Sequence, residues 1–123
     1  MIIADGKNPK AQAFRTELLN RCPSQADRED LNIVIGGDGF LLRTIYERDY
    51  KGTFLGLNAG HLGFLLNDVH DWEAITSALK ADRWVAHRFP LLQAEVQTPD
   101  GDTLISQAIN DVYVQRTTGH AAH

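Results

Sequence analysis

The chain has 123 residues and is mildly acidic, with 12 Lys and Arg against 16 Asp and Glu and a formal net charge of −4. Its 43% apolar and 23% charged residues are typical of a globular domain, and the longest apolar runs fall short of the roughly 18–20 residues of a membrane span. Lys and Arg never cluster beyond a pair, so composition argues against nucleic acid and membrane as partners. A cytoplasmic protein is expected.

The first half of the chain alternates predicted strands and helices. Residues 1–4 form a short apolar run, and Asn8 followed by Pro9 predicts the start of a helix, because Asn caps helices and Pro favours their first position. The apolar residues of this helix recur at helical spacing: Ala11, Phe14, Leu18 and Leu19. The β-branched residues 33–35 then predict a parallel strand that is buried on both faces.

Further elements follow in the same alternation. Residues 41–46 predict a short helix with Leu41, Leu42, Ile45 and Tyr46 as its apolar positions, and residues 54–57 predict another buried strand. Asp71 is expected to cap a helix that carries Trp72, Ile75 and Leu79 on one side. Residues 92–97 alternate apolar and polar side chains, which predicts a strand with one wet face. A turn at 98–102 and a return strand over 104–114, broken near Asn110, complete an antiparallel hairpin.

Glycine is concentrated where chemistry is expected. Seven of the ten glycines lie between Gly36 and Gly63. Gly36-Gly37-Asp38-Gly39 joins the strand at 33–35 to the next helix, and backbone N–H groups in such a turn can face a phosphate. Asp38 repels phosphate, so it is better suited to accept hydrogen bonds from a hydroxyl or to hold a cation. The block is neither a Walker A loop nor a complete dinucleotide fingerprint, and a plain strand–helix turn is the alternative.

A second glycine-rich turn, residues 56–65, follows the strand at 54–57. In a parallel sheet both turns open at the same edge, where ligands of α/β folds bind. Asp38 and Asn58 are therefore expected to converge on one ligand. His61 is either a polar contact there or an ordinary loop residue.

Three blocks follow one another along the chain: Gly36-Gly37-Asp38-Gly39, the segment NAGHLGFL at 58–65 and the segment AINDV at 108–112. In residues and in order they resemble the NAD kinase family. The first block is shared with diacylglycerol and sphingosine kinases, while the other two are specific. The resemblance implies a parallel-sheet, nucleotide-binding α/β domain over residues 1–90. Residues 91–123 would be the first antiparallel strands of a β-rich second domain.

The activity implied by the resemblance is phosphorylation of the 2′-hydroxyl of the adenosine ribose of NAD, with ATP or polyphosphate as donor. Asp38 matches the proton acceptor of the family, and Gly39 a backbone contact to the nucleotide. Arg43 matches a basic position that binds NAD in some members, although a solvated helix charge is the alternative. The other matched binding residues are Phe64 beside the adenine, Asn110 and Asp111 on the ribose hydroxyls, and His123.

The resemblance also implies Mg²⁺ or another divalent cation, arriving with ATP, and a homo-oligomer. The chain resembles the N-terminal portion of the family only, so by itself it is expected to bind NAD weakly and to turn nothing over. Two other hypotheses stay open. One is a lipid kinase of the diacylglycerol type, for which the blocks at 58–65 and 108–112 would be unnecessary. The other is a non-catalytic fragment that binds nucleotide.

Overall fold

The computed structural model describes residues 1–61, 65–86, 91–97, 99, 103–109 and 114–116. Its elements, in chain order, are β1 Ile2–Ala4, α1 Pro9–Arg21, a 3-10 turn Pro23–Asp27, β2 Asn32–Gly36, α2 Asp38–Glu47, β3 Phe54–Asn58, α3 Trp72–Lys80, β4 Trp84–Ala86, β5 Leu91–Gln97, β6 Thr103–Ile109 and β7 Val114–Arg116. No described helix is long and apolar enough to cross a membrane.

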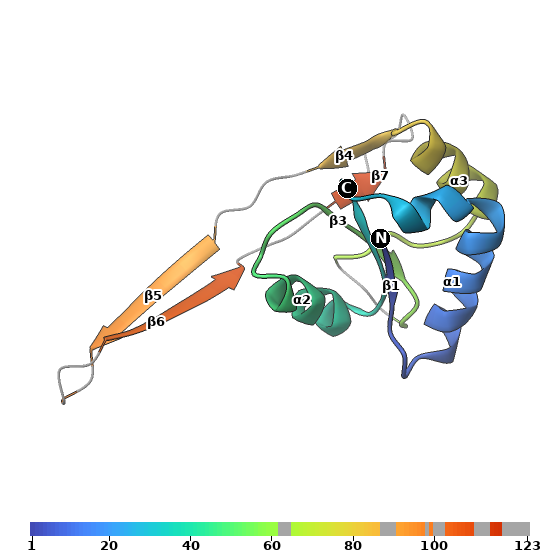
Figure 1. Cartoon of the computed structure of the whole chain (residues 1–123). Coiled ribbons are helices and arrows are strands. Elements are labelled where there is room, and N and C mark those ends of the chain that lie inside the picture. The colour runs from blue at the N-terminus through green and yellow to red at the C-terminus, as the bar shows by residue number, and fades with distance from the viewer. Residues whose placement is uncertain (62–64, 87–90, 98, 100–102, 110–113, 117–123) are drawn as a thin grey trace.

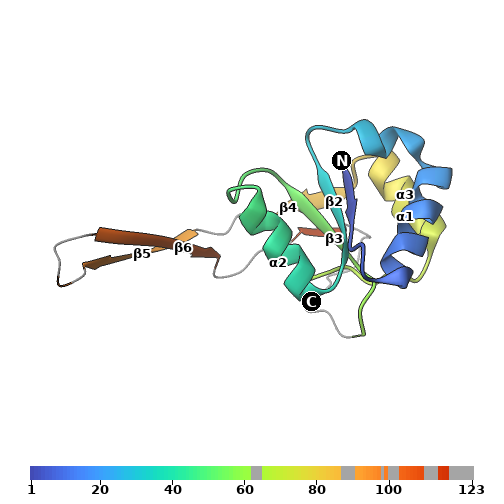
Figure 2. The same ribbon diagram turned by 60° about the horizontal axis from the view of Figure 1, so that its bottom comes forward.

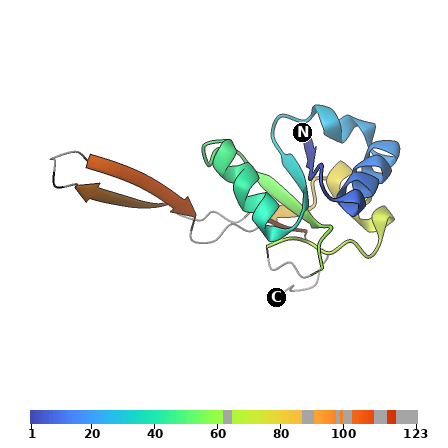
Figure 3. The ribbon, with the colours of Figure 1, turned by 90° about the horizontal axis from the view of Figure 1, so that it is seen from below.

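The centre of the molecule is a parallel sheet in the order β1-β2-β3, with helices on both faces. Helices α1 and α3 cover one face and α2 covers the other (Figure 1), and the view from below in Figure 3 separates the two layers. The central strand β2 is buried from Ile33 to Gly36. A strand that is buried on both faces needs a layer of helices on each face. The helices on the two faces of this sheet therefore confirm the predicted α/β class for this part of the chain.

Each face of the sheet has its own apolar core. Beneath α1 and α3 the buried residues are Ala11, Leu18, Cys22, Leu31, Ile33, Ile35, Leu55, Leu57, Ala59, Ile75 and Leu79. Beneath α2 they are Val34, Leu41, Ile45, Phe54 and Leu66. Cys22 is 1% exposed, and its thiol lies 4.0 Å from the carbonyl oxygen of Thr76 in α3.

The predicted helix starts agree with the structure. The Asn8 side chain accepts hydrogen bonds at the start of α1, and Asp71 does the same for α3. In α2 the expected apolar face is only partly buried, because Leu42 is 39% and Tyr46 is 65% exposed. The buried residues of that helix are Leu41, Thr44 and Ile45, and the short helix predicted over 41–46 is confirmed within α2.

The C-terminal part of the described chain is antiparallel. Strands β5 and β6 pair along their length, from Leu91 opposite Ile109 to Gln97 opposite Thr103. The two strands project away from the α/β part, as Figures 1 and 2 show. The predicted return strand agrees with β6, which ends at Ile109 beside the expected break at Asn110. Val114, the predicted end of that strand, lies instead in β7, which pairs with β4 and contacts β3. Strand β4 was not predicted. The division of the chain at residue 90 stays a prediction.

Candidate functional site at the carboxyl edge of the sheet

The carboxyl ends of β1, β2 and β3 meet at one edge of the sheet, as the parallel register requires. The two glycine-rich turns lie against each other there. A Cβ placed on Gly60 would be 3.7 Å from the Cα of Gly37, and the Ala59 N–H donates to the Gly36 carbonyl at 2.9 Å. The expectation that the two turns share one edge is thus correct.

The three glycines of the first turn are not all needed for the same structural reason. A Cβ on Gly36 would lie 2.8 Å from the Phe40 ring, so packing requires glycine at this position. At Gly37 and Gly39 an added Cβ would meet nothing within 4 Å among the described residues, and neither has a positive φ. Neither packing against the described residues nor backbone conformation explains these two glycines, and close approach of a ligand to the backbone is a third reason for glycine.

Asp38 is the first residue of α2 and is half-buried. Its Oδ1 accepts a hydrogen bond from the Leu65 N–H at 3.1 Å, so the second turn holds the carboxylate of the first. The start of α2 has no side-chain cap, in contrast to α1 and α3. Its first N–H groups therefore combine with the positive end of the helix dipole at an edge where a polar ligand can bind.

Asn58 ends β3 and is 9% exposed. Its Oδ1 accepts from the Gly60 N–H at 2.9 Å, and its Nδ2 donates to Asp68 Oδ1 at 3.0 Å. Both ends of the amide thus hold the turn itself. The contact with the exposed Asp68 was missed in the sequence, because nothing in the spacing of two loop residues indicates it. A direct contact of Asn58 with a ligand stays a prediction.

Gly39 and Arg43 lie one helical turn apart at the start of α2, and both are exposed. His61, within the second turn, is also exposed. Four predicted binding residues lie outside the described part of the chain: Phe64, Asn110, Asp111 and His123. Within the described part, no three His, Cys, Asp or Glu side chains are grouped so that they could hold a metal ion.

Comparison with known proteins decides the family. The chain is 34% identical to NAD kinase of Xylella fastidiosa over 92% of its length, and 32% identical to NAD kinase of Streptococcus thermophilus over 94%. NAD kinase of Zymomonas mobilis is 29% identical over the whole chain. The chain belongs to the NAD kinase family. No family model matches it.

The match covers most of this chain but only part of each of these NAD kinases. The chain covers 43% of the Xylella protein, 44% of the Streptococcus protein and 48% of the Zymomonas protein, so it spans less than half the length of each relative. The matched part is the N-terminal part of the NAD kinases. The glycine-rich turns and the three-stranded parallel sheet described above belong to this shared part.

Proposed function

We propose that this chain takes part in phosphorylating the 2′-hydroxyl of the adenosine ribose of NAD, giving NADP, with ATP or polyphosphate as the phosphoryl donor. Family membership supports the proposal at the level of the enzyme class. The observation that carries it is the pair Gly37 and Gly39, at which an added Cβ would meet no described atom, with Asp38 between them at the start of α2.

Asp38 is the proposed proton acceptor. As the ribose oxygen forms its bond to the terminal phosphorus, the hydroxyl proton moves to the Asp38 carboxylate and the bond from phosphorus to the rest of the donor breaks. The hydrogen bond from Leu65 N–H fixes the orientation of this carboxylate. An oriented carboxylate raises the fraction of encounters in which the hydroxyl is correctly placed.

The nucleotide contacts are proposed for neighbouring groups. The backbone of Gly39 and the exposed guanidinium of Arg43 lie along the same start of α2 and suit a phosphate or ribose of NAD. Asn58 would act from the second turn. We further propose Phe64 beside the adenine, Asn110 and Asp111 on the ribose diol, which accepts and donates hydrogen bonds, and His123 on NAD.

Mg²⁺ or another divalent cation is proposed to arrive as part of the ATP substrate. The described residues hold no cluster of three potential ligands, and Mg²⁺ with a nucleotide is commonly held by phosphate oxygens, water and one or two carboxylates. Asp38 is the carboxylate of this edge that could share such an ion.

The organisation of the chain is proposed along the same lines. Residues 1–90 would form the α/β domain and residues 91–123 the first strands of a β-rich second domain, with NAD kinase activity in a homo-oligomer in the cytoplasm. Because the chain matches less than half of each relative, we expect these 123 residues alone to bind NAD weakly and to produce no NADP.

Two measurements test this proposal. Calorimetric titration of the 123-residue chain with NAD should show weak binding that the Asp38→Asn substitution changes. The protein at its natural length should form NADP from NAD with Mg²⁺-ATP or polyphosphate. Phosphorylation of diacylglycerol but not of NAD would instead support the lipid kinase. Nucleotide binding by the natural-length protein without any transfer would support a non-catalytic role.

A further inference from the structure

The side chain of Asn8 joins two turns that lie 51 residues apart in the sequence. Its Oδ1 accepts from the N–H groups of Lys10 and Ala11 at 3.0 and 3.2 Å, which caps α1. Its Nδ2 donates to the Ala59 carbonyl oxygen at 3.1 Å. Because N–H groups face one end of the amide and a carbonyl faces the other, the orientation of the amide is fixed. Helix capping needs only the acceptor end.

The residue that Asn8 holds is also held from the opposite side. Ala59 is 4% exposed, and its N–H donates to the Gly36 carbonyl oxygen at 2.9 Å. The next residue, Gly60, lies close to Gly37. A Cβ added to Gly60 would be in van der Waals contact with the Cα of Gly37. The peptide groups of Ala59 thus connect the turn after β1, the end of β2 and the turn after β3. Asn8 supplies the connection from β1.

We propose that Asn8 is a positioning residue for the nucleotide, acting through Ala59; this rests on the function proposed above. By holding the turn at 58–60 against Gly37, the Asn8 amide sets the position of that turn beside Gly37 and Gly39, where an added Cβ would meet no described atom. A displaced turn would alter the surface that NAD contacts at residues 58–60, whereas the N–H group that holds the Asp38 carboxylate belongs to Leu65, further along the chain. The effect is therefore expected on NAD affinity rather than on the rate of transfer.

The substitution Asn8→Asp separates this role from capping. Aspartate caps a helix about as well as asparagine, but it places a second acceptor against the Ala59 carbonyl. A matched control is Asp71→Ala, which removes the cap of α3, where Asp71 Oδ1 accepts from Glu73 N–H at 3.0 Å. Three quantities are measured for the natural-length protein: thermal midpoint, hydrogen exchange of the Ala59 and Gly60 amides, and the steady-state constants for NAD.

In Asn8→Asp we expect the KM for NAD to rise about fivefold or more and the two amides to exchange faster by a similar factor, the equivalent of one hydrogen bond. The kcat should change by no more than about twofold, because the substitution weakens the binding of NAD equally in the ground state and in the transition state. Asp71→Ala should lower the thermal midpoint by a few degrees, by loss of a cap, without changing KM.

An unchanged KM for NAD in Asn8→Asp, or unchanged exchange at Ala59 and Gly60, would overturn the proposal. A fall in kcat with constant KM would do so too, since that is the pattern of a merely less stable protein. Failure of the unaltered protein to form NADP contradicts the proposed function instead. The exchange measurement needs no substrate, so it still decides whether Asn8 holds the turn.

Discussion

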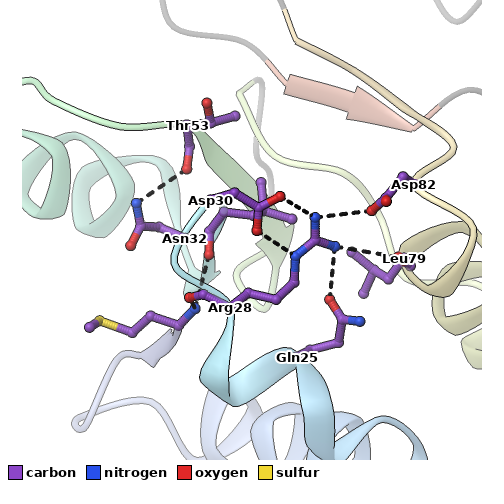
Figure 4. Close-up of polar contacts among 9 residues, drawn as sticks. Gln25, Arg28, Asp30, Asn32, Thr53, Leu79 and Asp82 are labelled. Carbon is purple, nitrogen blue, oxygen red and sulfur yellow. Dashed lines mark hydrogen bonds and ion pairs between the residues drawn. The ribbon is translucent and has the colours of Figure 1, made fainter.

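The amino end of β2 lies beside a charged cluster, whereas the carboxyl ends of β1 to β3 are held by amide and backbone hydrogen bonds around two glycines whose added Cβ would meet no described atom. In the charged cluster, Arg28 binds both oxygens of Asp30 at 2.8 and 2.6 Å and reaches Asp82 at 3.0 Å (Figure 4). It also donates to Gln25 and to the Leu79 carbonyl. One guanidinium thereby ties the segment before β2 to the end of α3.

The carboxyl ends of the strands are held by other kinds of contact. There Asn8 and Asp38 each bind a backbone group of a neighbouring turn, and Asn58 binds one within its own turn. A Cβ added to Gly37 or Gly39 would meet no described atom. A charged cluster that joins two segments stabilises the fold, while the carboxyl edge of a parallel sheet is where ligands of α/β folds bind. Substitutions at the carboxyl end should therefore alter activity, and those at the amino end stability.

The largest effect is expected from Asp38→Asn. The amide keeps the size of the side chain and can still accept from Leu65 N–H, but it cannot take up the hydroxyl proton. We expect the rate of NADP formation to fall by roughly 10²–10⁴ at constant thermal midpoint. Glu47→Gln, at the other end of α2 and exposed, is the matched control and should leave the rate unchanged. A rate for Asp38→Asn near that of the control would show that another group accepts the proton.

The next effect is expected from Gly39→Ala. The added methyl group meets no described atom and removes a glycine from the first turn of α2, so the free energy of unfolding should rise by up to about 0.5–1 kcal/mol. The same methyl group occupies space proposed for the nucleotide, and NAD affinity should fall about tenfold, or about 1.4 kcal/mol. Calorimetric titration and chemical denaturation measure the two changes.

Gly36→Ala provides the contrast for that experiment. Its Cβ would lie 2.8 Å from the Phe40 ring and 3.2 Å from Phe40 Cβ, so the fold has to shift, at a cost of about 1–3 kcal/mol. Equal destabilisation by Gly36→Ala and Gly39→Ala would contradict the view that one glycine serves packing and the other a ligand.

A moderate effect is expected at the opposite end, from Arg28→Met. The Arg28 side chain is 14% exposed, but its partners Asp30 and Asp82 are 64% and 66% exposed, so each ion pair contributes little. Loss of the hydrogen bonds to Gln25 and Leu79 adds to this, and the free energy of unfolding should fall by about 1–2 kcal/mol. The KM for NAD should stay constant. An altered KM would mean that the two ends of the sheet are coupled.

The smallest effect is a pH dependence of stability. The hydrogen bond from Arg28 lowers the pKa of Asp30 below its ordinary value. A carboxyl group with a lowered folded-state pKa stabilises the fold above its unfolded value, about 3.9, and loses this contribution as pH falls through the folded value. Thermal midpoints measured from pH 6 to pH 3 should therefore fall less steeply in Asp30→Asn than in the unaltered protein. If the thermal midpoints of the two proteins fall equally with pH, Asp30 does not contribute to the pH dependence of stability.

Much of the α/β part follows from local sequence signals. The caps at Asn8 and Asp71 and the buried strand at 33–35 are set by chemistry within a few residues, and the structure confirms them. The exposure of Tyr46 and the pairing of β7 with β4 depend on which elements are present to cover them. Local periodicity does not contain that information, because it reports only that a face is apolar.

The site was predictable to a similar extent. The glycine pattern placed Asp38 at a strand–helix turn, and the parallel order of the strands placed the second turn beside it. The hydrogen bonds of Asn8 to Ala59 and of Asn58 to Asp68 were not predictable. Each joins loop residues whose distance in space is set by the packing of whole elements rather than by their spacing in the sequence.

The burial of Cys22 between α1 and α3 gives this protein a built-in chemical reporter. Cys22 is the single cysteine of the chain, so a maleimide would modify one site, and only when the helices separate from the sheet. Nucleotide that binds the closed form alone lowers the population of the open form by the factor 1 + [L]/Kd. The rate of labelling against NAD concentration would therefore trace a binding curve in which no phosphoryl transfer is needed.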